Sequence, residues 1–344
     1  MSSSETDIIL PVWNRPAETR ECLAALVEHS DDARLILLDL GSDTETEQLL
    51  HEFAEFLGDR AILFRSEQTR GFVETVNRGL STASAPLMIA LRASSRVTSG
   101  WLEPLRETAR RPDAGVLVPR LLLHGGGQSS RKRTEVMAME TSHGTFSAIG
   151  ITRRLYAKVG GFDCGLDGNV WCLRDYSRRA DLAGFRTLHV DGPPLLFRDE
   201  AVYGSAARRE RLLRESAAAF SARWGEAQTY SLCLSRNADQ ETLSRVFAVI
   251  LAGARRGHRF FVLVPSGMYR RIEGAGLHRL HENITLERLS RFFPSRSVRL
   301  AFARFRDTHP DMKLLNGIEG LVELDGEVGV SIAEMENRFT AVEV

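Results

Sequence analysis

Short runs of apolar residues recur along the first hundred residues, and stretches with helical spacing separate them. The runs are Ile8–Val12, Leu35–Leu38, Ala61–Phe64 and Leu87–Leu91, and they recur about every 26 residues. Because each run is continuous rather than alternating, we expect strands buried on both faces, and therefore a mostly parallel sheet covered by helices. The pattern predicts a doubly wound α/β domain, a class that binds ligands beyond the carboxyl ends of its strands.

The stretches between these runs carry residues that begin and end helices. Pro16 opens the first stretch, and the polar segment Ser30–Asp32 ends it. In the second stretch Ser42 and Glu45 have the spacing of a capping box. The third, Phe72–Leu80, has apolar residues at helical spacing. We therefore expect one helix in each gap.

Composition and charge exclude several classes of protein. The chain has 344 residues, 43% of them hydrophobic and 26% charged, which fits two globular domains and excludes a disordered chain. The 45 basic and 45 acidic residues cancel, so we expect no nucleic-acid partner. The four cysteines form no CxxC pair, which is typical of reduced thiols. With no signal-peptide pattern at the start, the sequence predicts a cytoplasmic protein with at most peripheral membrane contact.

The residues at the predicted strand ends resemble those of a known family. No GxGxxG motif and no Walker A lysine is present, so the dinucleotide-binding and P-loop classes lose support. Seven fragments instead resemble, in order, family 2 glycosyltransferases of the GT-A fold, and most of all a bacterial rhamnosyltransferase-like branch. They are ILPVWNRP, LLDLGSD, TRGFVETVNRGL, SGWLEPL, PDAGVLVPRL, TRRLYAKVGGFD and LAGFR. The resemblance implies a hexosyltransferase-type enzyme of polysaccharide biosynthesis. Such an enzyme moves a sugar from a nucleotide-diphosphate sugar to a saccharide, lipid-linked or protein acceptor.

The resemblance also implies roles for residues at the strand ends. Pro11 and Asp39 would line a nucleotide pocket, with Asn14 beside them, because a carboxylate can accept the N–H of a uracil or guanine ring. A cap on its own turn is the alternative for Asp39. Arg70 and Gly71 fit a helix start that faces a phosphate or sugar. The alternative for Arg70 is an exposed side chain without a role.

Two departures from the family pattern affect its metal site. Members carry an Asp-x-Asp-like signature after the fourth strand, where acidic groups hold Mg²⁺ or Mn²⁺. This chain has Arg92-Ala93-Ser94-Ser95 there, without a carboxylate. The histidine that commonly completes the metal site is replaced by Phe197 or Arg198, and the nearest histidine, His189, belongs to the preceding strand. A hard cation needs oxygen ligands with negative charge, so we predict that no divalent metal binds.

The third departure affects the general base. The family carries a Glu-Asp-x-Asp stretch whose aspartate deprotonates the acceptor hydroxyl, and here Cys172-Leu173-Arg174-Asp175 stands in its place. Asp175 alone remains acidic, and it becomes the predicted base. Its alternative role is a helix N-terminal charge that interacts with the dipole. Asp163 and Asp167 are nearby alternatives as bases, or formers of a turn.

Two interpretations of these losses remain open. In the first, the protein is a metal-independent glycosyltransferase in which Arg92 and Arg198 supply the positive charge. In the second, it is a catalytically inactive homologue that binds a nucleotide, a sugar or a partner protein as a scaffold subunit. Residues 124–133, rich in glycine, serine and basic side chains, form either a lid over the acceptor or an ordinary surface loop.

The C-terminal part of the chain predicts a second domain. We place the first domain at residues 1–225 and a small α/β domain at 226–344, with apolar runs Tyr230–Leu234 and Phe260–Val264 around a helix from about Gln240 to Arg256. Its predicted role is oligomerisation or acceptor contact. Arg288–Arg306 interleaves arginine with aromatic residues, which fits either contact with anionic lipid or a half-buried element with a solvated arginine face. The acidic tail from Gly320 fits contact with this basic face within the chain or in a homo-oligomer.

Overall fold

The computed structural model of the protein describes residues 4–66, 71–123, 138–167, 170–198, 206–316 and 329–340. The chain divides into two compact units. The first comprises Met1–Ala138 and His143–Trp224, and the second comprises Met139–Ser142 and Gly225–Val344. The predicted division has a single boundary, between residues 225 and 226. The observed division differs because the short segment Met139–Ser142 also belongs to the second unit.

The first unit alternates strands and helices along its length. In chain order the elements are β1 (Thr6–Val12), α1 (Pro16–His29), β2 (Arg34–Asp39), α2 (Thr44–Leu57), the 3₁₀ turn Gly58–Arg60, β3 (Ala61–Arg65), α3 (Phe72–Thr82), β4 (Leu87–Leu91), β5 (Ser95–Arg96), α4 (Leu102–Ala109), β6 (Ala114–Leu123), β7 (Ala138–Glu140), β8 (Ala148–Thr152), α5 (Arg153–Val159), α6 (Val170–Leu182), β9 (Arg186–Phe197) and α7 (Ala206–Trp224). Each of the four apolar runs lies inside an observed strand, and a helix fills each gap as predicted.

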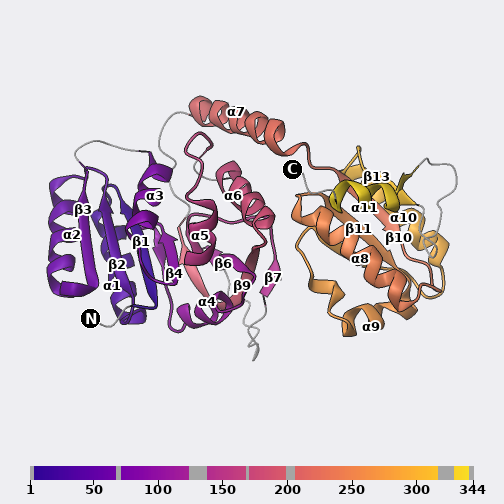
Figure 1. Ribbon diagram of the computed structural model, residues 1–344, viewed down its shortest axis with the longest axis horizontal. Helices are drawn as coiled ribbons and strands as arrows, with labels where there is room; N and C mark the ends of the chain where they lie inside the picture. Colours follow the sequence, from indigo (N-terminus) through magenta and orange to yellow (C-terminus); the bar gives the residue numbers. More distant parts are fainter. Residues whose placement is uncertain are drawn as a thin grey trace. The chain divides into compact units, whose positions relative to one another are not determined.

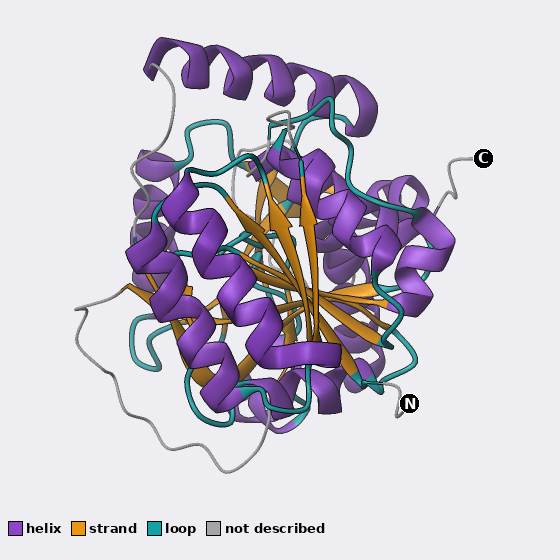
Figure 2. Ribbon diagram, turned by 90° about the vertical axis from the view of Figure 1, so that its left-hand side faces the viewer, coloured by secondary structure: helices purple, strands orange, loops and turns teal. Residues whose placement is uncertain are grey.

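The strands of the first unit form one mostly parallel sheet (Figures 1 and 2). Its path is β3-β2-β1-β4-β8-β6-β9-β5. β1 runs parallel to β2 and β4, and β2 runs parallel to β3, whereas β8 is antiparallel to β4 and β6. The predicted GT-A type of α/β fold is confirmed. Because β1 to β4 are parallel, their carboxyl ends meet at one edge of the sheet.

Alternating residues of the strands bury the two faces of this sheet. Ile8 and Leu10 of β1 pack on the side of α1, α2 and α4, and Ile9 packs on the opposite side with α3, α5 and α6. Helices therefore cover both faces, as the orange strands between purple helices show in Figure 2. The continuous apolar runs of the sequence follow from this burial on both sides.

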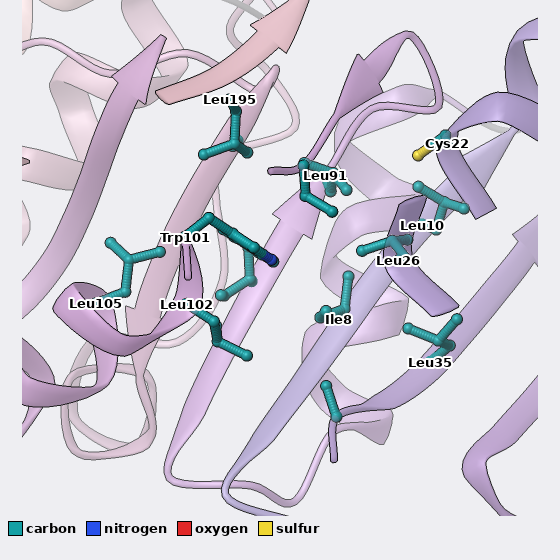
Figure 3. Packing of buried hydrophobic residues seen from close by; sticks show 14 of the residues in the cluster. Ile8, Leu10, Cys22, Leu26, Leu35, Leu91, Trp101, Leu102, Leu105 and Leu195 are labelled. Carbon is teal, nitrogen blue, oxygen red and sulfur yellow. The ribbon is translucent and has the colours of Figure 1, made fainter. Parts of the chain in front are cut away.

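Trp101, at the start of α4, fills the first of these cores (Figure 3). Its ring is 1% exposed and lies with Leu91 and Leu195, which come from β4 and β9. The indole Nε1 donates a hydrogen bond to Ser30 Oγ at 3.0 Å, so the polar end of the ring is satisfied within the core. This contact fixes α4 next to the end of α1.

Two details of α2 differ from the sequence prediction. Its N-cap is Asp43, whose Oδ1 accepts from the Thr46 amide at 2.9 Å, rather than Ser42. The Ser42 hydroxyl accepts a hydrogen bond from the backbone N–H of Asn14 at 2.9 Å. Because this bond to a neighbouring loop occupies the hydroxyl, Ser42 does not cap the helix. Phe56 is 74% exposed, although its spacing fits the apolar face.

The second unit is a parallel α/β sheet. In chain order its remaining elements are β10 (Thr229–Cys233), α8 (Gln240–Arg255), β11 (Arg259–Val264), α9 (Ser266–Gly274), the 3₁₀ turn Leu277–Arg279, β12 (Ile284–Arg288), α10 (Pro294–Thr308), β13 (Lys313–Asn316), β14 (Val330–Ser331) and α11 (Ile332–Thr340). The strand order is β12-β11-β10-β13-β14, and every pairing is parallel. The sequence predicts only the first strand–helix–strand part of this sheet.

The helices of the second unit cover both faces of its sheet. α8, α9 and α11 bury one face, and α10 buries the other through Val298, Ala301 and Phe305. Arg288–Arg306 includes a half-buried helix, as one of its two interpretations predicts, and contact with anionic lipid stays a prediction. No helix in the described ranges has the length and apolar composition needed to cross a membrane.

The segment Met139–Ser142 is held in the second unit by side-chain and backbone bonds. Arg255 donates two hydrogen bonds to the Glu140 carboxylate, at 2.6 and 2.7 Å. The Ser142 amide donates to Glu282 Oε1 at 2.8 Å. A bidentate arginine–carboxylate pair is geometrically specific, so this segment has one defined place in the unit.

Candidate functional site

The carboxyl edge of the first sheet holds most of the residues predicted to bind a ligand. Pro11 lies buried in β1, one residue before the strand ends, and Gly71 is the N-cap residue of α3. Apart from its chain neighbours, no atom of the described residues lies within 4 Å of the position that a Cβ on Gly71 would take. Arg70 and the predicted lid, residues 124–133, lie outside the described residues.

Asn14 ties the end of β1 to the end of β2. The backbone N–H of Asn14 donates a hydrogen bond to Ser42 Oγ at 2.9 Å, and its side-chain Oδ1 accepts one from the backbone N–H of Asp43 at 2.8 Å. Asn14 and Arg15 both have positive φ, at 55° and 61°, a conformation that asparagine tolerates better than most residues. The side chain of Asn14 therefore shapes the two loops at the edge of the sheet.

Asp39 caps the turn that follows β2. Its carboxylate is 3% exposed, and Oδ1 accepts from the Ser42 amide at 2.9 Å. Oδ2 lies 3.7 Å from Nη1 of Arg65, which also pairs with Glu47. The cap that the sequence offers as an alternative is thus present, and contact with a nucleotide base stays a prediction.

Arg92 is the first residue after β4. Its guanidinium carbon lies 4.7 Å from the ring centroid of Phe72, the first residue of α3. Phe72 in turn meets Phe146 edge to face at a centroid distance of 5.2 Å. A cation over an aromatic face is held by the ring quadrupole, so Arg92 has a defined place at the sheet edge.

Arg198 follows β9 and comes close to the segment after β4. Its amide donates to the Ser94 carbonyl oxygen at 3.3 Å, and β5 pairs with the end of β9. The structure therefore brings together the two positions at which the family keeps metal ligands. The Arg198 guanidinium donates to Glu21 Oε2 at 2.9 Å.

A small pocket that is open to solvent lies between α1, the segment after β4 and the end of β9. It is lined by Glu18, Glu21, Cys22, Ala93, Ser94, Ser95, Arg96, Leu196, Phe197 and Arg198. Burial raises the pKa of the Cys22 thiol to about 12, so this residue stays protonated at neutral pH and is no thiolate ligand. Sequence reasoning missed Glu18 and Glu21, because acidic residues on an amphipathic helix carry no signal that separates them from a solvated face.

The described residues around this pocket do not fit a hard divalent cation, and Asp199 and Glu200, which follow Arg198, lie outside the described residues. Glu18 pairs with Arg15 at 3.0 Å and Glu21 pairs with Arg198, so both carboxylates already face a positive charge. Two serines and two arginines complete the polar lining, and Mg²⁺ or Mn²⁺ prefers anionic oxygen ligands. Within the described ranges no group of three or more His, Cys, Asp or Glu side chains could hold a metal ion. Metal independence of the activity stays a prediction.

Asp175 lies within an ion-pair cluster on α6. It is 0% exposed, and its two oxygens accept from Arg179 Nε at 2.8 Å, Arg223 Nη1 at 2.7 Å and Trp224 Nε1 at 2.9 Å. Hydrogen bonds from Arg223 to Asp175 and then to Asp163 raise the pKa of the Arg223 guanidinium. This geometry links α6 to the end of α7. It gives the predicted base no access to an acceptor hydroxyl.

The two alternative bases also have structural contacts. Asp163 Oδ1 accepts from the Gly165 amide at 2.8 Å, and this bond, followed by the Arg223 pair, keeps the pKa of Asp163 low. Asp167 accepts from the amides of Val170 and Trp171 at 2.8 and 2.7 Å, at the start of α6. Both act as turn or helix caps, the alternative role that the sequence suggests.

Arg174 and His143 form a contact that the sequence does not indicate. Arg174 Nη2 lies 2.7 Å from His143 Nε2, and its guanidinium lies 4.9 Å from the Trp171 ring. Because arginine carries only donors, Nε2 of His143 accepts, and Nδ1 holds the ring proton. Arg174 occupies the variable third position of the Glu-Asp-x-Asp stretch, so its cation replaces none of the acidic residues of that pattern.

The strand order and the helices on both faces of the sheet are those of a doubly wound α/β domain of the GT-A type. Residues 7–180 match the family model described as "Glycosyl transferase family 2". Because this match spans half of the 344 residues, the chain belongs to glycosyl transferase family 2. The predicted family is confirmed, and its rhamnosyltransferase-like branch stays a prediction.

Several curated relatives share part of the chain. A PGL/p-HBAD biosynthesis glycosyltransferase of Mycobacterium tuberculosis is 32% identical over 94 residues, which are 27% of this chain and 36% of that protein. Polypeptide N-acetylgalactosaminyltransferase 5 of Caenorhabditis elegans is 23% identical over 146 residues, 42% of this chain and 20% of that protein. The matched part thus spans about a third of the mycobacterial relative.

One solved structure aligns over most of the chain. It is the mannosyltransferase PcManGT from Pyrobaculum calidifontis in complex with GDP-Man and Mn²⁺, with a TM-score of 0.49 and 14% identity. The alignment covers 88% of this chain and 87% of that chain.

Proposed function

We propose that this protein is a hexosyltransferase-type glycosyltransferase that needs no divalent metal. Its donor is a nucleotide-diphosphate sugar bound at the carboxyl edge of the first sheet, with the base near Pro11 and Asp39. Family membership supports the transfer chemistry. The proposal that no metal is needed rests on the backbone hydrogen bond between Arg198 and Ser94. This bond brings Arg198, at the end of β9, next to the segment that begins with Arg92.

The chemistry of transfer explains why arginines suit these positions. The oxygen of the acceptor hydroxyl forms a bond to the anomeric carbon of the sugar, its proton passes to a water molecule, and the bond from that carbon to the β-phosphate oxygen breaks. The bonding pair stays with the nucleoside diphosphate, which gains negative charge as it leaves. A guanidinium offers bidentate hydrogen bonds to phosphate and stays protonated, so Arg92 and Arg198 can stabilise this charge.

The Arg198–Glu21 pair allows a diphosphate to take the place of the carboxylate. The two side chains are 41% and 51% exposed. An exposed pair of this kind contributes about 0–1 kcal/mol, so its replacement by phosphate oxygens costs little. Arg198 would then bind the donor only when the donor is present. The acceptor, whether a saccharide, a lipid-linked sugar or a protein, would approach from the same edge of the sheet.

Transfer or donor hydrolysis in the presence of EDTA tests this function. Wild-type protein and Arg92→Ala are compared with UDP-, GDP- and dTDP-hexoses, with Arg110→Ala on the surface of α4 as the matched arginine control. We expect turnover to persist in EDTA and kcat/KM to fall about a hundredfold in Arg92→Ala, the loss typical of one charge-stabilising donor. Turnover that EDTA abolishes, or that Arg92→Ala leaves unchanged, contradicts the proposal.

A second candidate function has one observation in its favour. Asp175 is enclosed by three donors, so the predicted base has no open face. A catalytically inactive homologue that serves as a binding or scaffold subunit fits this feature. It predicts that UDP, GDP or dTDP raises the melting temperature without turnover, and that a catalytic partner co-purifies. Turnover of any hexose donor rules it out.

A further inference from the structure

A basic and apolar patch lies at the start of α10 in the second unit. We define the α10 patch as Arg291, Phe292, Phe293, Arg296, Arg299 and Leu300. The three apolar side chains are largely exposed, Phe292 at 81%, Phe293 at 69% and Leu300 at 61%. Large apolar side chains exposed within one short stretch of the chain indicate an interaction surface.

The orientation of α10 explains why these residues face outward. The helix buries Val298, Ala301 and Phe305 against its own sheet. At 100° per residue, Arg296 and Leu300 lie on the opposite side of the helix from these three. The exposed patch is therefore the consequence of a helix that already buries an apolar face, and it is not an unfilled part of the core.

Among the described residues, no carboxylate pairs with the arginines of the patch, and the acidic tail residues Glu319, Glu323, Asp325 and Glu327 lie outside the described residues. Residues 288–306 contain six arginines and no acidic residue. Of the ion pairs within the described ranges, Arg304 bonds Glu287 at 3.0 Å, whereas Arg291, Arg296 and Arg299 have no carboxylate partner there. The acidic residue Glu336 of α11 pairs with Arg245 of α8, so it does not neutralise α10.

We propose that the α10 patch binds the surface of an anionic lipid bilayer. Arginine heads suit lipid phosphates, and phenylalanine and leucine side chains suit the acyl boundary beneath them. The proposal goes beyond the transferase function, because it concerns the second unit and needs no donor. It would bring the protein to the surface at which a lipid-linked acceptor is found.

The same features count against other occupants. In a symmetric dimer formed through this patch, the unpaired arginines of two copies would face one another and repel. A nucleic acid offers phosphates and base faces, but it gives no apolar environment for Leu300.

Vesicle flotation of the full chain tests the proposal. Wild-type protein is mixed with phosphatidylcholine vesicles, with or without about 30 mol% phosphatidylglycerol, at low salt and at about 0.5 M salt, well above physiological ionic strength. We compare the double variant Phe292→Ser/Phe293→Ser and the triple variant Arg291→Gln/Arg296→Gln/Arg299→Gln. Phe56→Ser, an exposed phenylalanine of α2, and Arg270→Gln, an exposed arginine of α9, are the controls.

We expect binding to the anionic vesicles alone, weakened by salt. Each arginine removed should lower the partition coefficient about fivefold, and the double phenylalanine variant should lower it at least as much as one arginine. Both controls should bind like the wild type, and all variants should keep the wild-type circular dichroism spectrum. Absence of wild-type binding to anionic vesicles overturns the proposal. The proposal is also overturned if the patch variants bind anionic vesicles as well as the wild type does. A wild-type dimer that the phenylalanine variant converts to a monomer, or tighter binding to an oligonucleotide than to vesicles, overturns it as well.

Discussion

Arg198 and Glu21 form a hydrogen-bonded ion pair of 2.9 Å across the pocket beside the first sheet. The pair joins the end of β9 to the middle of α1. It places a positive and a negative group at the point where a family with metal-dependent members keeps a cation site. Under the proposed function, an incoming diphosphate would replace Glu21 as the partner of Arg198.

This exchange makes a prediction about donor affinity. Glu21→Gln should release Arg198 and tighten the binding of a nucleoside diphosphate about two- to fivefold, as expected for loss of an exposed competitor. Arg198→Gln should weaken it about tenfold. Calorimetric titration with UDP, GDP and dTDP measures both effects. Glu18→Gln is the control, because Glu18 pairs with Arg15 and not with Arg198. Weaker binding by Glu21→Gln would show that the carboxylate helps to hold the ligand.

The cluster around Asp175 makes a prediction about stability. Asp175→Asn should lower the free energy of unfolding by about 3 kcal/mol, because two arginines and an indole would lose a buried anion. Asp163→Asn is the control and should cost less, since that carboxylate is 29% exposed. Urea unfolding and kcat are measured on the same samples. A large loss of kcat at unchanged stability would instead restore Asp175 as the base.

The close packing of α3 against β1 makes a second prediction about stability. A Cβ on Gly79 would lie 2.2 Å from Cγ2 of Ile9, in the core. Gly79→Ala should therefore cost about 1–3 kcal/mol, the range for an overpacked core. Gly267→Ala in α9 is the control, because no atom lies within 4 Å of its added Cβ. Thermal melts of both variants decide the point, and equal melting temperatures would contradict it.

The lowered pKa of Asp7 leads us to expect that the first unit loses part of its stability in acid. Burial alone would raise the pKa of this carboxyl, but hydrogen bonds from Arg34 and from the amides of Ser84 and Ala85 outweigh burial and lower it below 3.8. A carboxyl whose pKa is lower in the folded state than in the unfolded state stabilises the fold at pH values above its unfolded-state pKa. This stabilisation is lost as the pH falls through the folded-state pKa.

Asp7→Asn should therefore be less stable than wild type at neutral pH, and the difference should shrink below about pH 4. Melting temperatures between about pH 7 and pH 3 measure it. Asp239→Asn at the start of α8 is the comparison variant: hydrogen bonds from Thr242 also lower the pKa of this exposed carboxyl, so its difference from wild type should have the same sign and be smaller. A difference between wild type and Asp7→Asn that grows on acidification would show the opposite sign of linkage.

The strands of the first unit could be predicted from the sequence, and the partners of its site residues could not. Ile8–Val12 is apolar without interruption because both of its faces are covered, so composition alone locates it. Arg198 lies 177 residues from Glu21, and nothing local in either segment indicates the pair. Asp175 likewise meets Arg223 and Trp224, which are 48 and 49 residues away at the end of α7. A motif comparison finds the position of a missing base, but not the groups that now enclose the remaining carboxylate.

The capping of α2 shows a second reason for error. Ser42 and Asp43 are adjacent, and both are good cap residues by propensity. The choice between them depends on Asn14, a residue of another loop that uses the Ser42 hydroxyl. Local preference ranks candidates, and a tertiary contact selects among them.

The segment Met139–Ser142 has a consequence for how this protein could have evolved. Its bonds to Arg255 and Glu282 make it part of the second unit, although the chain returns to the first unit at His143. A single recombination event at residue 225 would therefore not transfer the second unit whole to another glycosyltransferase. The two units are expected to be inherited together, and a search for free-standing relatives of the second unit should look for a chain that replaces these four residues.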